Sequence, residues 1–324
     1  MDFISKEKDE NLRKGKLKRG DIILTTRGTV GNVAYFNENI PYENIRINSG
    51  MLILRPNVDK IHPYYLYLFL RSNLFKKQVI SQGSGSAQPQ LPIGSLKYIN
   101  LPWKDIATQQ KIASVLSSLD SKIELNNRIN AELEAMAKTL YDYWFVQFDF
   151  PNAQGKAYKT SGGAMVWNKE LKREIPEGWE VGTMLNFGEI IGGSTPPREK
   201  EEYFSTNGTA WITPKDLSLN TGNKFITKGE LDVSEQGLKV ASLNIMPKGT
   251  ILLSSRAPIG YLAISRENVT TNQGFKSFVP NKGFPTEYVY YAVKNLIPTI
   301  ENNAVGSTFK EVSASTLTQL AANI

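Results

Sequence analysis

Short hydrophobic runs separated by polar turns occur twice in this chain, in the same order. "GDIILTTRGTVGNVAYF" begins at Gly20, and "GTILLSSRAPIGYLAI" begins at Gly249. Each stretch places an apolar run after a glycine turn, then a polar turn, then a second apolar run, which is the pattern of a β-hairpin. The chain is therefore expected to contain two copies of one small unit.

The correspondence between the copies extends beyond the hairpins. Gly20 and Gly249, like Arg27 and Arg256, are 229 positions apart. Further along, the pairs drift slightly in offset: "INSGMLILRP" (47–56) matches "TNQGFKSFVP" (271–280), and "GSGSAQPQLPIGSL" (83–96) matches "AVGSTFKEVSASTL" (304–317). Between these pairs, "HPYYLYLFLRS" and "FPTEYVYYAVK" each predict a helix that begins at a proline. We therefore predict an α+β fold with two related domains joined by a long helix.

The segment 105–145 has a helical period instead. It contains neither proline nor glycine and predicts one helix of about 60 Å. Its apolar residues recur at spacings of three and four, as in a coiled-coil seam with two central asparagines. The predicted pairing residues are Ile112, Leu116, Leu119, Ile123, Asn126, Asn130, Leu133, Leu140 and Trp144.

No other segment of this sequence matches that helix in length, so we expect its apolar stripe to be covered by a helix of another chain. The alternative is packing against the two flanking domains, which would cover its ends but hardly its middle.

These patterns divide the chain into four segments. We expect a first domain at 1–102, a long spacer helix at 103–148, a linker at 149–174 and a second domain at 175–324. The linker is rich in Gly, Asn, Lys and Ser and is expected to lie on the surface with one short turn of helix. The first copy lacks the front part of the second, and no long helix follows the second copy.

Composition narrows the class of partner. The net charge of +7 and the pI of about 9.2 suit a polyanion such as DNA or RNA, although many basic proteins bind neither. The absence of cysteine excludes disulfides and thiolate metal sites, and the single histidine, His62, is expected to precede a helix rather than act in catalysis. No apolar run approaches the roughly 20 residues of a membrane span, and no signal peptide is recognisable, so we expect a cytoplasmic protein without membrane contact.

Three patterns resemble those of one known family, in the order that the family has them. "LPWKDIATQQKIASVL" resembles a spacer motif in which a proline and Gln-x-x-Ile-Ala lead into a long helix, and "IPEGWE" resembles the start of a recognition domain. The paired "GDIILTTRGTVG" and "GTILLSSRAPIG" resemble a strand-turn pattern inside such domains. The chain is thus similar, over nearly all its length, to the specificity (S) subunit of type I restriction-modification systems.

The resemblance implies two target-recognition domains that each read half of a bipartite site in double-stranded DNA, with two antiparallel helices between them. It implies methyltransferase (M) subunits docked along these helices and an endonuclease/translocase (R) subunit in the full complex. S-adenosylmethionine, Mg and ATP would belong to those partner subunits, with no cofactor in this chain. Because the chain departs from the pattern at both ends, another S-like chain is a further expected partner. The alternative is a truncated scaffold that binds other chains through the helix without reading DNA.

Cations, amides and hydroxyls in the paired segments, together with others in 192–200 and 213–217 of the second copy alone, are the candidate DNA contacts. They are Thr25, Thr26, Arg27, Ser84, Ser86, Gln88 and Gln90 in the first copy, and Ser194, Thr195, Arg198, Lys215, Arg256, Ser307, Thr308 and Lys310 in the second. The equivalent Arg27 and Arg256 either contact DNA or form internal ion pairs, since a residue that reads a base should differ between half-sites. No methyltransferase, Walker A or metal-ligand motif is recognisable, so we expect neither catalysis nor a metal site.

Overall fold

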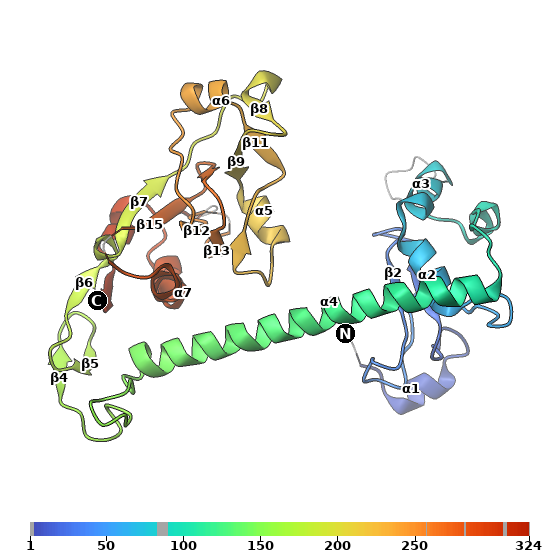
Figure 1. The fold of residues 1–324 in the computed structure, drawn as a ribbon, viewed down its shortest axis with the longest axis horizontal. Helices are drawn as coiled ribbons and strands as arrows, with labels where there is room; N and C mark the ends of the chain where they lie inside the picture. Colours follow the sequence, from blue (N-terminus) through green and yellow to red (C-terminus); the bar gives the residue numbers. More distant parts are fainter. Residues whose placement is uncertain (1–2, 83–89, 257, 282, 307–309, 324) are drawn as a thin grey trace. The chain divides into compact units, whose positions relative to one another are not determined.

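The computed structural model describes residues 3–82, 90–256, 258–281, 283–306 and 310–323. The chain forms two compact units, unit 1 (Met1–Ala131) and unit 2 (Glu132–Ile324). The long helix α4 (Ile106–Tyr141) is continuous and contributes its first part to unit 1 and its last part to unit 2 (Figure 1). The finer division into four segments stays a prediction.

Unit 1 is built on a three-stranded antiparallel sheet of order β2-β1-β3. Its strands are β1 (Ile22–Thr25), β2 (Val33–Tyr35) and β3 (Met51–Leu54), and its helices before α4 are α1 (Lys6–Asn11), α2 (Pro63–Arg71), α3 (Asn73–Gln82) and the 3₁₀ helix η1 (Ile93–Tyr98). The inward residues Ile22 and Leu24 of β1 pack with Phe69 and Phe75 in one apolar core. The hairpin and the helix beginning at a proline are both confirmed.

Gln109 fixes the start of α4 against unit 1. Its side chain is fully buried; Nε2 donates to the backbone oxygens of Lys60 (3.3 Å) and Lys104 (2.7 Å). Its Oε1 accepts the backbone N–H of His62 at 2.9 Å. His62 precedes α2 as its N-cap residue, as predicted. The buried glutamine of the spacer motif therefore satisfies three backbone groups and holds the start of α4 in place.

Unit 2 repeats this sheet and extends it. A five-stranded sheet has the order β10-β13-β12-β15-β7, and a second sheet has the order β14-β9-β11-β8. The strands are β7 (Gly188–Gly192), β8 (Phe204–Ser205), β9 (Thr209–Ile212), β10 (Phe225–Ile226), β11 (Leu231–Val233), β12 (Ile251–Leu253), β13 (Leu262–Ser265), β14 (Val269–Thr271) and β15 (Lys276–Pro280). The helices are η3 (Met184–Asn186), η4 (Glu201–Tyr203), α5 (Pro214–Leu219), α6 (Glu235–Val240), α7 (Thr286–Asn302) and α8 (Ala314–Thr318), and β6 (Val181–Thr183) pairs with β16 (Ala321–Asn323).

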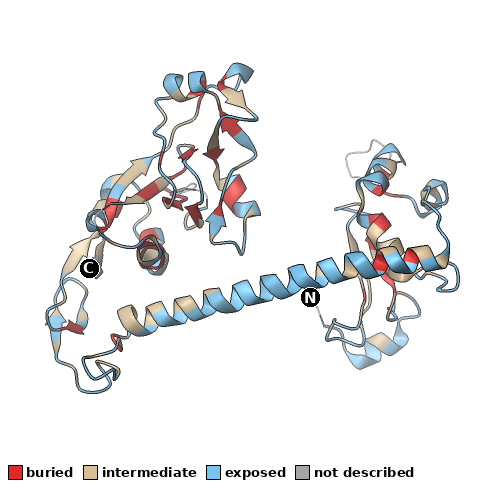
Figure 2. Ribbon diagram, viewed as in Figure 1, coloured by how far each residue is buried: buried red, intermediate tan, exposed pale blue. Residues whose placement is uncertain are grey.

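The three central strands of the larger sheet, β13-β12-β15, correspond to β2-β1-β3 of unit 1. The helices also correspond at the sequence offsets that relate the two copies. Helix α6 corresponds to α1, α7 to α2 together with α3, and α8 to η1. Even the caps agree, since Ser5 and Ser234 each accept a backbone N–H three residues later. The predicted repeat and the α+β class are therefore confirmed. Figure 2 shows the buried residues gathered in the strands and helices of each unit, while much of α4 is exposed.

One detail of the sequence prediction is wrong. The segment 149–174 was expected to hold a short helical turn, but β4 (Met165–Asn168) pairs with β5 (Arg173–Pro176) in a hairpin. Asn168 Oδ1 accepts two backbone N–H groups at the start of the connecting turn, which favours a turn over a helix. The predicted long helix is confirmed, since the π-helical turn η2 (Asp142–Val146) directly continues α4 beyond Tyr141.

Within unit 2, α4 is held by a charged contact to α7 and to the segment before β10. Glu134 accepts hydrogen bonds from the Tyr291 hydroxyl (2.8 Å) and pairs with Lys224 Nζ (2.7 Å). Burial alone would raise the pKa of Glu134, but the bonds from Lys224 and Tyr291 outweigh it and hold that pKa below its usual value.

Candidate DNA-recognition surface

The arginine-containing turn is built by the same hydrogen bonds in both units. Thr25 Oγ1 accepts the N–H of Asn32 at 3.0 Å, and Ser254 Oγ accepts the N–H of Tyr261 at 2.8 Å. Each hydroxyl also donates to a backbone oxygen of its turn. The hydroxyl therefore closes the hairpin, which explains why Thr and Ser recur here. Thr25, predicted as a DNA contact, already uses its hydroxyl within the fold.

The residue after each hydroxyl ties the hairpin to two further segments. Thr26 N–H donates to Gly50 O (2.8 Å), and Ser255 N–H donates to Gly274 O (2.7 Å). The backbone oxygens of Thr26 and Ser255 in turn accept the N–H groups of Leu91 and Val312, both at 2.9 Å. Thr26 is buried and its hydroxyl also bonds to Gly50, so it too is structural rather than exposed to a ligand.

Ser254→Ala is expected to lower the free energy of unfolding of unit 2 by about 1–3 kcal/mol, because it leaves a buried N–H of the hairpin without an acceptor. Ser255→Ala is the matched control, since its buried Oγ has no hydrogen-bond partner among the described residues. Urea denaturation of the two variants should separate them clearly. Equal stability of both would contradict this role of Ser254.

Arg27 and Arg256 follow these residues at equivalent places in both units. Each pairs through its backbone with the matching loop, Arg27 with Gln90 and Arg256 with Glu311. Within the described parts of the chain, neither guanidinium has an ion-pair partner; Glu311 instead lies 4.0 Å from Lys276. The alternative of an internal ion pair thus gains no support, and DNA contact by the two arginines stays a prediction.

Unit 2 contains a cleft of about 500 Å³ beside Trp211. The Trp211 side chain is buried, its Nε1 donates to Ser194 O at 3.1 Å, and the Arg198 guanidinium lies 5.8 Å from its ring centroid. The cleft is lined by Arg198, Glu201, Phe204, Trp211, Thr213, Pro214, Lys215, Asp216, Glu230, Leu231 and Asn272. Two of the predicted cations therefore share one concave surface.

Lys215 reaches this cleft from the first turn of α5, but its charge is not isolated. Its Nζ lies 2.5 Å from Glu230 Oε2, and this hydrogen bond raises the pKa of Lys215. Both side chains are exposed. A phosphate at Lys215 would have to compete with Glu230, so Arg198, which has no carboxylate partner among the described residues, is the stronger of the two candidates.

The loop that follows β7 joins the cleft to the turn before β15. Ser194 N–H donates to Thr271 O at 3.0 Å, and the Thr195 hydroxyl donates to Gln273 Oε1. A Cβ at Gly274 would lie 3.2 Å from Pro214 Cγ and 3.7 Å from Arg256 Cγ, so this turn also touches α5 and the arginine hairpin. The structure thus brings five of the predicted residues near one turn: Ser194, Thr195, Arg198, Lys215 and Arg256.

Several predicted residues remain apart from this group. Ser84, Ser86, Gln88, Ser307 and Thr308 lie outside the described residues. Gln90 and Lys310 are exposed beside the backbone pairings of Arg27 and Arg256. Sequence reasoning missed Trp211 and Gln273; the signal for Gln273 was its place in the matched "INSG" and "TNQG" turns, where the copies differ.

The predicted stripe on α4 is largely exposed. The solvent-exposed fractions of Leu119 and Ile123 are 51% and 57%. Leu116, Leu133 and Leu140 are exposed as well. Asn126 and Asn130 are also exposed, whereas Ile112 and Trp144 are half-buried. Further exposed apolar residues were not predicted and widen the stripe: Val115, Leu125, Ile129 and Met136. Within the described ranges, no helix has the length and apolar character needed to cross a membrane.

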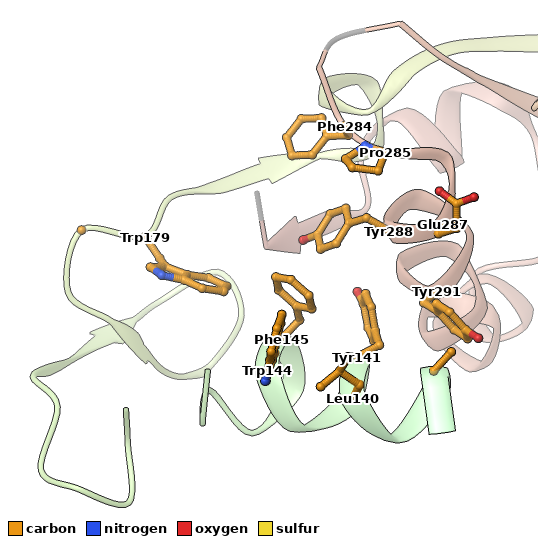
Figure 3. Close-up of a pocket in the computed structure, with 12 residues that line it drawn as sticks. Leu140, Tyr141, Trp144, Phe145, Trp179, Phe284, Pro285, Glu287, Tyr288 and Tyr291 are labelled. Carbon is orange, nitrogen blue, oxygen red and sulfur yellow. The ribbon is translucent and has the colours of Figure 1, made fainter. Parts of the chain in front are cut away.

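An aromatic pocket of about 560 Å³ lies where α4 ends in unit 2 (Figure 3). Leu140 and Trp144 of the stripe line it, together with Phe145, Trp179 and Tyr288. Burial raises the pKa of Tyr288 to about 12. The apolar surface of the helix therefore continues into a hollow of this unit.

Comparisons with known proteins agree with the repeat. A family model described as the type I restriction modification DNA specificity domain matches residues 4–135 and 176–324. A crystal structure of a type I restriction-modification S subunit from M. genitalium has a TM-score of 0.54 and 15% identity, with 96% of this chain and 73% of that chain covered, which supports a shared fold.

Two relatives differ in how much of their length is matched. The MjaIX specificity subunit of Methanocaldococcus jannaschii is 43% identical over 160 residues, which are 48% of this chain and 37% of the relative. The HindI specificity subunit of Haemophilus influenzae is 26% identical over 331 residues, covering 87% of this chain and 71% of the relative. With both copies of the repeat matched by the family model, this chain belongs to the type I restriction-modification specificity family.

Proposed function

We propose that this chain is a DNA-reading subunit of a type I restriction-modification complex, in which unit 2 contacts a half-site through the surface around its cleft. The observation that carries the proposal is a cleft lined by Arg198, Lys215 and Asn272. Asn272 belongs to the turn that also contains Gln273, which Thr195 bonds, and Gly274, which lies close to Arg256. Cations position a duplex through its phosphates, while amide and guanidinium groups read base edges. Unit 1 presents the equivalent turn with Arg27 and Gln90, and we propose that it contacts the other half-site.

The stripe on α4 is the proposed docking surface for other subunits. An apolar helix face this exposed is costly in water, and its period fits a second helix. We propose that the helix pairs with one from another S-like chain and that M subunits dock along the pair. The aromatic pocket beside Leu140 and Trp144 would take a large apolar side chain at one end of the stripe. The alternative function, a scaffold that assembles other subunits without reading DNA, rests on this same surface.

The chemistry of the complex belongs, in this proposal, to its other subunits. S-adenosylmethionine would bind the M subunits, and Mg and ATP would serve the M and R subunits. Since such a complex acts on cellular and incoming DNA, we place the chain in the cytoplasm.

Salt dependence of DNA binding tests the proposed surface. Arg198→Ala with Lys310→Ala is expected to weaken binding to all sequences and to reduce the slope of log affinity against log salt by about 1–2, because up to two phosphate contacts are lost. The measurement is a gel-shift titration at several salt concentrations, with and without M subunits.

The matched control for this experiment is Lys156→Ala with Lys169→Ala, which removes two exposed cations from the segment before the second domain. It should leave the slope unchanged. Binding by the wild-type chain that ignores sequence and disappears at moderate salt, even with M subunits present, would favour the scaffold instead.

A further inference from the structure

The turn before β15 and its counterpart before β3 have the same internal frame. Asn272 Oδ1 accepts the N–H of Gly274 at 2.9 Å, and Asn48 Oδ1 accepts the N–H of Gly50 at 2.9 Å. In both units the glycine oxygen then accepts the N–H of the residue that precedes the arginine, at 2.7 Å in unit 2 and 2.8 Å in unit 1. The two turns are therefore held in the same way against the arginine hairpin.

The residue at the tip of this turn is the one that differs within the shared frame. Unit 2 has Gln273 between the asparagine and the glycine, and unit 1 has Ser49. Gln273 is exposed, so its side chain contributes nothing to the core. A residue that reads a base should vary between units that read different half-sites, whereas a residue that supports the fold should not. Gln273 meets the first description, and Asn272 and Gly274 meet the second.

The Gln273 amide is oriented before any ligand arrives. The Thr195 hydroxyl donates to Gln273 Oε1. An amide oxygen has two acceptor positions, so this bond leaves one acceptor position and both Nε2–H donors available. Among the described residues, Gln273 makes no other side-chain hydrogen bond. The side chain thus presents an acceptor and a donor in a fixed order.

The surroundings of the turn suit a nucleic-acid edge. Asn272 lines the cleft that also contains Arg198 and Lys215, and a Cβ at Gly274 would lie 3.7 Å from Arg256 Cγ. Cations near an exposed amide suit an arrangement in which phosphate contacts set the register and the amide reaches the base. The order of donor and acceptor on a glutamine amide matches the N6 donor and N7 acceptor of adenine in the major groove.

We propose that Gln273 is a specificity-determining residue of unit 2 that recognises an adenine, with Thr195 as its positioning residue. The proposal rests on the DNA-reading function proposed above. It names Gln273 as a residue that reads the site and adenine as the base that it reads. Ser49 occupies the same position in unit 1 and is too short for the same bidentate contact, so the two units prefer different bases at this point.

Selection from a randomised duplex library tests the proposal, using the full chain assembled with its M subunits. The wild-type complex is expected to enrich a bipartite site that includes an A·T pair read by unit 2. Gln273→Ala should reduce the preference at that one base pair by about 5- to 150-fold and leave the other positions and the salt slope unchanged. Thr195→Val removes the donor and should reduce preference at the same base pair by a smaller factor.

The controls distinguish failure of the proposed role of Gln273 from failure of the proposed DNA-reading function. Ser49→Ala should leave the A·T preference of the unit 2 half-site as it is. An unchanged site in Gln273→Ala, or uniform weakening at every position, would overturn the role of Gln273 while DNA reading stands. If the wild-type complex enriches no sequence at all, the proposed function itself is overturned.

Discussion

Replacing both Leu119 and Ile123 by aspartate is expected to abolish assembly with other subunits while unit 2 stays folded. Both side chains are at least half exposed in the chain, so the substitutions remove little internal packing. In an assembled helix pair, however, two carboxylates would be buried in an apolar seam at several kcal/mol each, which weakens association by about a thousandfold or more. Light scattering and affinity capture with M subunits measure the loss.

The control for this experiment lies on the opposite face of α4. Ser114 and Ser121 are exposed and project about 180° away from the stripe by helical geometry. Ser114→Asp with Ser121→Asp adds the same charge and should assemble normally. Assembly that survives in the Leu119 and Ile123 variant, with circular dichroism unchanged in both, would show that the stripe is not the docking surface.

Gly193→Ala is expected to destabilise unit 2 strongly. A Cβ at this position would lie 2.0 Å from Asn272 O and 2.4 Å from Thr271 O, and Thr271 O also accepts the N–H of Ser194, so moving it away would break that bond. We expect a loss of about 3 kcal/mol or more in unfolding free energy. The loop carrying Ser194 and Thr195 should also separate from the turn at Gln273, so sequence preference in DNA selection falls with stability.

The neighbouring glycine provides the comparison. A Cβ at Gly192 would meet only the flexible end of Lys276, at 4.0 Å, so Gly192→Ala should change stability little. Thermal denaturation of the two variants tests the difference, which for a unit of this size corresponds to a shift in Tm of about 6–12 °C. Equal Tm values would mean that the loop relaxes away from the turn at no cost.

The parts of this structure that depend on local pattern could be predicted from the sequence. The two hairpins follow from apolar runs around a glycine turn, and α4 follows from a long stretch without proline or glycine. The stripe on α4 was predicted from its period, and the exposure of Leu119 and Ile123 agrees with a surface that this chain does not cover.

The parts that depend on distant contacts could not be predicted. The sheet β14-β9-β11-β8 pairs strands by long-range hydrogen bonds that leave no periodic signal, and the cleft beside Trp211 exists only once that sheet has formed. The orientation of Gln273 depends on the Thr195 hydroxyl, 78 positions away in the sequence. The internal use of the Thr25 hydroxyl could not be predicted either, because composition alone does not reveal a bond to a turn a few residues away.

The shared frame of the turns before β3 and β15 has an evolutionary consequence. In each turn the asparagine side chain accepts the glycine N–H, and the glycine oxygen accepts an N–H of the arginine hairpin, so the side chain at the tip takes part in neither bond and can be exchanged. A single codon change at position 49 or 273, or recombination between the duplicated segments, would then alter target preference without lowering thermal stability. New target preferences can therefore arise by mutation without being removed by selection for a stable fold.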